Sequence, residues 1–153
     1  MSLFRTLLAA ILLAVCASHA GWAAAQSTPS SVKDLVARTK AQIRTIDMAA
    51  FKSALDKRKA GLVVDVREPG EYASGHVPGA INIPRGVIEL NIWPHVGFPD
   101  ATDLNSKITL YCGSGTRCVL AAKSLQDLGF TNAVAVDMRI ADWAKAGYPL
   151  VTE

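Results

Sequence analysis

One stretch near the C-terminal end constrains the fold more than any other part of the chain. Residues 108–111 form a short apolar run bounded by polar residues, which is typical of a buried strand. From Cys118 onward, apolar residues recur at positions 121, 122, 125 and 128, the spacing of a helix that packs one side on a sheet. Gly129 is expected to end this helix in the left-handed conformation. The order strand, turn, helix places Cys112 at the carboxyl end of a strand, facing a helix N-terminus.

This position has consequences for the chemistry of Cys112. The first N–H groups of a helix have no partner within the helix and carry a partial positive charge. Gly113 and Gly115 can adopt positive φ, so that the turn gathers several N–H groups around one point, and Arg117 adds a cation at the rim. We therefore expect a thiol whose pKa lies well below about 8.5 and that is a nucleophilic thiolate at neutral pH. The alternative is a core cysteine followed by an ordinary strand-to-helix turn.

Three runs of residues resemble the rhodanese domains, a family of sulfurtransferases. Cys-Gly-Ser-Gly-Thr-Arg at 112–117 resembles the active-site loop of the family. The run Val-Val-Asp-Val-Arg-Glu-Pro-Gly-Glu-Tyr at 63–72, followed by Gly-His-Val-Pro-Gly-Ala-Ile-Asn-Ile-Pro at 75–84, is a second and more specific match. Trp-Ala-Lys-Ala-Gly-Tyr-Pro-Leu at 143–150 resembles the C-terminal signature. The resemblance extends from about residue 45 to 150.

The expected fold is α/β, with a mainly parallel central sheet and helices on both faces, because apolar strands alternate with helical segments. The resemblance implies the family's order of about five strands. It also implies that Cys112 takes sulfur from a donor such as thiosulfate or a persulfide and passes it to a thiol or cyanide acceptor through a Cys112 persulfide. The loop residues Gly113, Ser114, Gly115, Thr116 and Arg117 would bind this sulfur. No metal or organic cofactor is required, and the acceptor can be a protein thiol.

Other residues of the matching runs are assigned to the scaffold. Asp65 interrupts an apolar strand, and a buried carboxylate must be paired, for which Arg67 is the natural partner. The resemblance implies that Asp65, Arg67 and Glu71 brace the loops beside the active site. His76 invites interpretation as a general base, but the resemblance implies a structural hydrogen-bonding role.

Two segments depart from the family pattern. Met138 and Arg139 stand where rhodanese domains commonly have a Gly-Gly pair, and Arg139 would bring a second cation towards the sulfur site. Residues 85–106 are longer than in the leanest single-domain rhodaneses. Within them, Trp93, His95 and Phe98 either line the mouth of the active site or cover an edge of the core.

Two other functions compete with sulfur transfer. Phosphatases and arsenate reductases use a related loop with five residues between Cys and Arg, whereas here four intervene, which suits one sulfur better than a tetrahedral oxyanion. The second alternative is a thiol redox or sulfur-carrier protein that uses Cys112 with Cys118. Against it, Cys118 lies on the apolar stripe of the helix, so that we expect it to face the core, away from Cys112.

The N-terminus indicates export. Residues 1–25 read as a signal peptide, with Arg5 before an apolar run at 7–15 and Ala-Ala-Ala at 23–25 as the cleavage site. A weaker cleavage site at 18–20, an uncleaved anchor and a lipoprotein box ending at Cys16 are alternatives. Residues 26–42 are interpreted as a linker and an N-terminal helix capped by Ser31, and residues 43–153 as the rhodanese-like domain. The mature protein is then periplasmic or secreted.

Composition limits the partners. A chain of 153 residues, 50% of them hydrophobic, suffices for one domain with a core. The formal net charge is only +3, no cluster of Lys and Arg stands out, and aromatic residues make up 7%. Nucleic acid is therefore not an expected partner.

Overall fold

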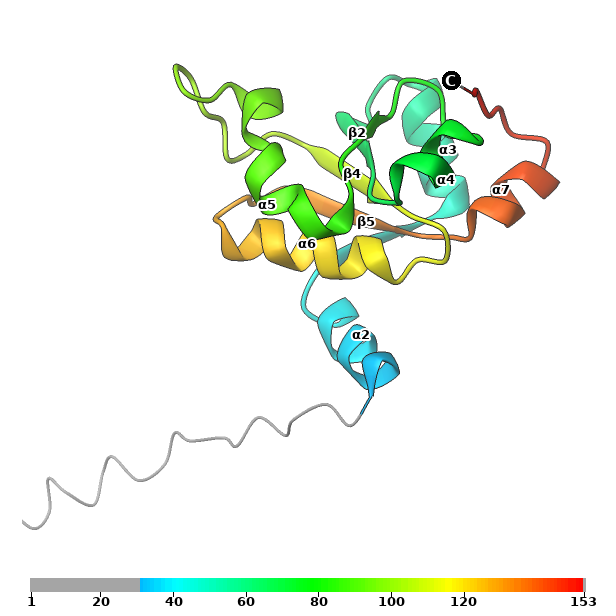
Figure 1. Ribbon diagram of the computed structural model, residues 1–153, viewed down its shortest axis with the longest axis horizontal. Coiled ribbons are helices and arrows are strands. Elements are labelled where there is room, and N and C mark those ends of the chain that lie inside the picture. The colour runs from blue at the N-terminus through cyan, green and yellow to red at the C-terminus, as the bar shows by residue number, and fades with distance from the viewer. Residues whose placement is uncertain (1–30, 153) are drawn as a thin grey trace, which may run out of the picture. The chain divides into compact units, whose positions relative to one another are not determined.

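A computed structural model describes residues 31–152, which form an α/β domain around one parallel sheet (Figure 1). The five strands pair in the order β1-β5-β4-β2-β3, and every pairing is parallel. Their bounds are Arg44–Asp47 for β1, Leu62–Asp65 for β2, Ile81–Asn82 for β3, Ile108–Tyr111 for β4 and Ala133–Asp137 for β5. The expected five-stranded α/β fold is confirmed. The predicted signal peptide, residues 1–25, lies outside the described residues.

Six α-helices lie within the described residues 31–152. They are α2 Val32–Lys40, α3 Met48–Asp56, α4 Pro69–Ala73, α5 Ile88–Asn91, α6 Arg117–Asp127 and α7 Ile140–Lys145, with short 3-10 turns η1 Arg85–Val87 and η2 Trp93–Val96. Ser31 caps α2 and Asp47 caps α3, each accepting a hydrogen bond from the N–H three residues later. None of these helices is long and apolar enough to cross a bilayer.

Helices cover both faces of the sheet, because alternate side chains of each strand point to opposite sides. On the face of α6, Val64, Leu110 and Ala135 pack with the apolar side of that helix. On the other face, Val63, Tyr111 and Val136 pack with Phe51 of α3 and Trp143 of α7. Figure 1 shows α6 on one side of the strands and α3 and α7 on the other. The three inner strands β2, β4 and β5 are therefore covered on both faces, as an apolar parallel sheet requires.

The C-terminal end of α6 is closed by the expected glycine motif. Gly129 has a φ of +98° and its N–H donates to Gln126 O, while the N–H of Phe130 donates to Leu125 O. These are the two hydrogen bonds of a Schellman cap. Phe130 is buried and lies against Trp93, with ring centroids 5.5 Å apart.

The segment Trp93 to Phe98 therefore covers an edge of the core at the C-terminal end of α6, and not the mouth of the cysteine loop. Trp93 packs on the core of the α6 face, and its indole N–H donates to Glu89 O at 2.8 Å. Phe98 contacts Trp93 and is 57% exposed. Of the two interpretations of this segment, the structure supports the second.

Candidate active site

Cys112 follows directly after β4, the middle strand of the sheet. Its Sγ lies 3.5 Å from the Sγ of Cys118 and 3.4 Å from the Cys118 N–H nitrogen, and both thiols are free. The prediction that Cys118 is buried in the core is confirmed. The prediction that it points away from Cys112 is wrong, because the turn of α6 that buries Cys118 also brings its sulfur over the end of β4.

Helix α6 begins without a side-chain cap, since Thr116 makes no capping hydrogen bond. The Cys112 sulfur takes this place by accepting the N–H of Cys118 at the first turn. The pKa of Cys112 is lowered to about 6. The largest cause is the hydrogen bond from the Cys118 thiol; burial opposes it, and hydrogen bonds from the N–H groups of Cys118, Ser114 and Gly115 lower the pKa further. The expected thiolate nest is thus present, with the sulfur of Cys112 itself at its centre.

The two glycines of the loop have different roles. Gly115 has a φ of +79°, and a Cβ on it would lie 3.3 Å from Asp137 Oδ1, so a side chain there is both strained and crowded. Gly113 does not adopt positive φ, contrary to expectation. Its lack of a side chain leaves room for Arg117 instead: a Cβ on Gly113 would lie 3.2 Å from a guanidinium nitrogen of Arg117, which would have to shift by a few tenths of an ångström, and 3.7 Å from Glu71 Oε1.

Cys112 has no solvent-exposed surface in this structure. It lies beneath its own loop, in which Ser114 and Thr116 are exposed and Gly113 and Arg117 are half-buried. The sulfur is therefore activated but covered. A donor can reach it only after some part of this cover has moved.

Arg117 is paired rather than free at the rim of the loop. Its guanidinium forms two hydrogen bonds to the Glu71 carboxylate, at 2.6 and 2.8 Å. The ion pair lowers the pKa of Glu71 to about 2, with the hydrogen bond from Arg117 as the largest cause. About a third of the Arg117 side chain and 42% of that of Glu71 remain exposed. The predicted cation is present, but a carboxylate that the scaffold supplies neutralises it.

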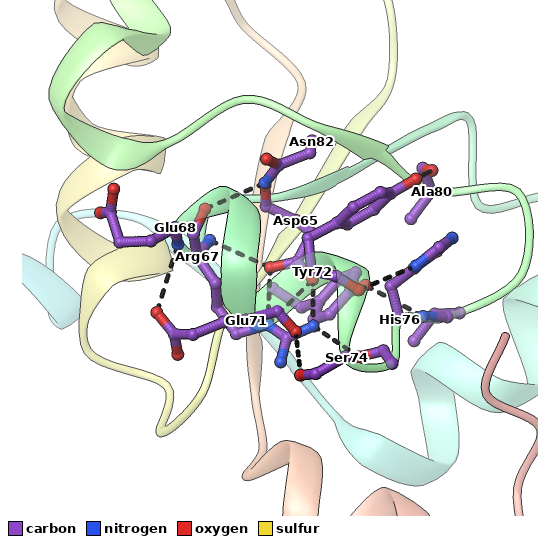
Figure 2. Close-up of polar contacts among 12 residues, drawn as sticks. Asp65, Arg67, Glu68, Glu71, Tyr72, Ser74, His76, Ala80 and Asn82 are labelled. Atoms are coloured by element: carbon purple, nitrogen blue, oxygen red, sulfur yellow. Dashed lines mark hydrogen bonds and ion pairs between the residues drawn. The ribbon is translucent and has the colours of Figure 1, made fainter. Parts of the chain in front are cut away.

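Asp65 and Arg67 form a buried ion pair behind this rim (Figure 2). Arg67 Nη2 lies 2.6 Å from Asp65 Oδ2, and Nε donates to both carboxylate oxygens at 3.0 and 2.9 Å. Arg67 Nη2 also donates to Gly75 O, at 2.7 Å. The side chain of Asp65 is 0% exposed and that of Arg67 is 5% exposed. The predicted pairing of Asp65 with Arg67 is confirmed.

Asn82 and His76 complete the hydrogen bonding of this region, as Figure 2 shows. The amide of Asn82 donates to the carbonyl oxygens of Asp65 and Arg67, at 3.0 and 2.9 Å. Sequence reasoning assigned Asn82 no role, although its place in the run 75–84 was a signal. His76 is buried, with Nδ1 3.0 Å from Tyr72 O and its ring stacked on that of Tyr72. This environment agrees with the structural role expected for His76.

Met138 and Arg139 do not extend the sulfur site. Met138 is buried among the residues packed against α7, and Arg139 precedes that helix with its side chain 66% exposed. Its guanidinium lies 3.6 Å from Asp142 on the same helix. The backbone nevertheless contacts the loop, because the N–H of Ile140 donates to Gly113 O at 3.2 Å.

The fold, the strand-end cysteine and its amide nest together define a rhodanese-type domain. The rhodanese-like domain family matches residues 47–146, and the chain belongs to this family. The expected family resemblance is thereby confirmed. Membership of this family, together with relatives named for sulfur transfer, supports sulfur transfer as the general chemistry of the domain.

Two curated relatives have names that refer to sulfur chemistry. The chain is 28% identical over 109 residues to a sulfurtransferase of Allochromatium vinosum, a match that covers 71% of this chain and 95% of the relative. It is 33% identical over 103 residues to the "Putative sulfur carrier protein YrkF" of Bacillus subtilis. That match covers 66% of this chain, and the chain spans about half (51%) of the length of that relative.

A solved structure resembles the domain as a whole. A protein of unknown function from Rhodopseudomonas palustris, described as a possible tyrosine phosphatase, is 27% identical, with a TM-score of 0.66. The match covers 82% of this chain and 98% of the other. The likeness shows that the fold of this domain also occurs in that protein.

Proposed function

We propose that this protein is a sulfurtransferase that carries one sulfur atom on Cys112. The observation that carries the proposal is the sulfur of Cys112 at the N-terminus of α6, with a pKa of about 6 and hydrogen bonds from Cys118, Ser114 and Gly115. Such a thiolate is the nucleophile at neutral pH. The sulfur-related names of two relatives support the same chemistry.

The reaction proceeds in two steps. The Cys112 thiolate attacks the outer sulfur of thiosulfate or a persulfide, the S–S or S–sulfonate bond breaks, and sulfite or a thiolate leaves. Cys112 then carries a persulfide whose negative charge lies on the outer sulfur, where the N–H groups of the loop stabilise it. A thiol, or cyanide in an assay, attacks this outer sulfur and releases the Cys112 thiolate.

Sulfur transfer is favoured over phosphate chemistry because the groups that would bind a phosphate already have partners within the protein. The N–H groups that would bind a phosphate oxygen point at the Cys112 sulfur. The guanidinium that would neutralise a phosphate is held by Glu71. A loop with four residues between Cys112 and Arg117 thus stabilises one sulfur better than a tetrahedral oxyanion.

The full cover of Cys112 adds a requirement to this proposal. The ion pair of Glu71 and Arg117 lies beside Gly113, next to the nucleophile, and is half-exposed. Half-exposed ion pairs stabilise a fold by less than about 1 kcal/mol. We therefore propose that the Glu71–Arg117 ion pair separates to let the donor reach Cys112.

The proposal is tested by loading the full-length purified protein with thiosulfate and measuring the intact mass, sulfite and, after cyanide, thiocyanate. We expect a species about 32 Da heavier, with the extra sulfur on Cys112. Cys112→Ser should give no mass increase and no thiocyanate. Cys118→Ser keeps a hydrogen-bond donor beside Cys112 and should still gain one sulfur. Thiocyanate formation by Cys112→Ser would refute the proposal.

We also propose that the chain is exported and cleaved after Ala25, so that the mature protein begins at Gln26 and acts in the periplasm or outside the cell. The mass of the N-terminal peptide from protein isolated from cells tests this. A peptide that retains Met1 or begins elsewhere in the leader would contradict it.

A further inference from the structure

The sulfur-transfer reaction makes and breaks no bond at the second thiol of the site, that of Cys118, which only donates a hydrogen bond to Cys112. It is free, fully buried and lies with its sulfur 3.5 Å from that of Cys112. No acceptor from solution can approach Cys112 as closely without first displacing part of the loop. The nearest thiol to any persulfide on Cys112 therefore belongs to the protein itself.

The local structure holds these two sulfurs together. Cys118 is the second residue of α6, and its N–H donates to Cys112 Sγ. Its sulfur lies 3.5 Å from the Cys112 sulfur, and its thiol donates to the carbonyl oxygen of Val136, also at 3.5 Å. A disulfide requires a sulfur–sulfur distance of about 2.05 Å, so the two atoms must approach by about 1.5 Å. The turn 113–116 between them can supply this movement.

We propose that Cys118 is a resolving cysteine that discharges the Cys112 persulfide as hydrogen sulfide. The proposal rests on the sulfur-transfer function proposed above. Cys118 Sγ attacks the inner sulfur, the bond from Cys112 Sγ to the outer sulfur breaks, and a Cys112–Cys118 disulfide forms. The outer sulfur leaves with the proton of the Cys118 thiol as hydrosulfide. The sulfane sulfur is reduced, and the two thiols are oxidised.

A dithiol reductant completes the cycle by exchanging with the disulfide and restoring both thiols. The complete reaction converts thiosulfate and a dithiol into sulfite, hydrogen sulfide and the oxidised dithiol. Proximity favours this route over transfer to a dissolved thiol, because groups held in contact react as if at very high concentration. The class of co-substrate is therefore a dithiol, and the product is sulfide rather than a new persulfide.

The test is a single loading of pre-reduced full-length protein with equimolar thiosulfate and no reductant, followed by intact mass, peptide mapping and sulfide determination. In the wild type we expect sulfite, then a transient gain of about 32 Da, then a species about 2 Da lighter than the reduced protein, with one hydrosulfide released per chain. Cys118→Ser keeps a hydrogen-bond donor beside Cys112, whereas Cys118→Ala loses it and should load more slowly. Both variants should stop at the heavier species and release no sulfide. Adding dithiothreitol to the lighter species should restore both thiols.

Three outcomes separate the two proposals. If the wild type keeps the extra sulfur as long as the Cys118 variants do, resolution by Cys118 is refuted and sulfur transfer stands. If neither the wild type nor the Cys118 variants gain sulfur, the proposed function itself fails. A disulfide that forms equally in samples without thiosulfate, and without sulfide, also refutes resolution, since it then arises by oxidation alone.

Discussion

Two ion pairs lie beside the active-site loop, and each joins a carboxylate to an arginine guanidinium, but they differ in their exposure to solvent. Asp65 and Arg67 are buried, with several hydrogen bonds that include the carbonyl of Gly75. Glu71 and Arg117 are half-exposed and join the short helix α4 to the N-terminus of α6. A buried pair cannot lose one partner without leaving an unpaired charge in the core, whereas water replaces the partner of an exposed pair. The first pair is therefore suited to a fixed brace and the second to a movable cover.

The comparison predicts the largest effect for Asp65→Ala. The substitution leaves the Arg67 guanidinium charged and without its partner in the core, so the free energy of unfolding should fall by about 3–5 kcal/mol. Urea unfolding followed by circular dichroism measures this. Asp56→Ala is the matched control, because Asp56 pairs with Lys52 on the exposed surface of α3 and its loss should cost less than about 0.5 kcal/mol. Equal losses in the two variants would contradict the assignment of Asp65 and Arg67 as a brace.

The second prediction uses pH to change the ionisation of the Cys112 thiol while the Glu71–Arg117 ion pair that covers it stays charged. Glu71, with a pKa of about 2, stays ionised across the range in which Cys112 titrates around pH 6. Cys112 has a lowered pKa, so its thiolate persists above about pH 6 and is lost as the pH falls through this value. Alkylation of Cys112 by iodoacetamide should then be about tenfold slower at pH 5 than at pH 7.

Peptide mass spectrometry assigns the modified residue in this experiment. Protein unfolded in urea is the control, in which the alkylation rate should reach half its maximum at about pH 8.5. A rate on the folded protein that keeps rising to pH 9 would show that the sulfur is not activated.

The third prediction concerns Glu71→Gln. The amide holds Arg117 less firmly, so the cover should open more often, and Cys112 should be alkylated and loaded with sulfur several-fold faster. The unfolding free energy should change by less than about 1 kcal/mol. Glu89→Gln is the control, because Glu89 of α5 is paired with Arg85 of η1 rather than with a residue of the cysteine loop, and should leave the alkylation rate unchanged. Slower or equal alkylation of Glu71→Gln would exclude this pair as the cover.

Gly113→Ala should have the smallest effect. Its Cβ would lie 3.2 Å from the end of the flexible Arg117 side chain, which can yield by a few tenths of an ångström. We expect alkylation of Cys112 to rise less than in Glu71→Gln, with little change in stability. Gly86→Ala, where a Cβ meets nothing within 4 Å, is the control. A loss of stability as large as that of Asp65→Ala would show that the loop cannot yield at Gly113.

Local sequence patterns predicted most elements of the fold. The apolar run at 108–111 became β4, the stripe from Cys118 became α6, and Ser31 caps the helix that it was expected to begin. These features depend on neighbours within a few residues, which a sequence displays directly. The covered side of α2 is not the most apolar one, since Val32 and Leu35 are 71% and 40% exposed while Thr39 is buried. Which side of a helix is covered depends on the partner, here α6.

The sequence predicted which residues belong to the candidate site, but not which of them are in contact with one another. The sequence indicated an activated Cys112, a cation at position 117 and a paired carboxylate at 65. It did not indicate that Glu71 neutralises Arg117, that Asn82 joins the carbonyls of Asp65 and Arg67, or that Cys112 is covered. These contacts join residues that lie 15 to 46 positions apart in the chain.

The amino-acid sequence alone determined the parallel α/β fold and the place of a cysteine at the end of a central strand, because strand and helix periodicity and a glycine-rich turn are local properties. Only the tertiary structure decided that Cys118 meets Cys112 sulfur to sulfur rather than facing away. A periodic stripe shows that a side chain is buried, but its neighbour in the core depends on how the loop sets α6 above β4. That contact turns a conventional core cysteine into a second candidate for the chemistry of the site.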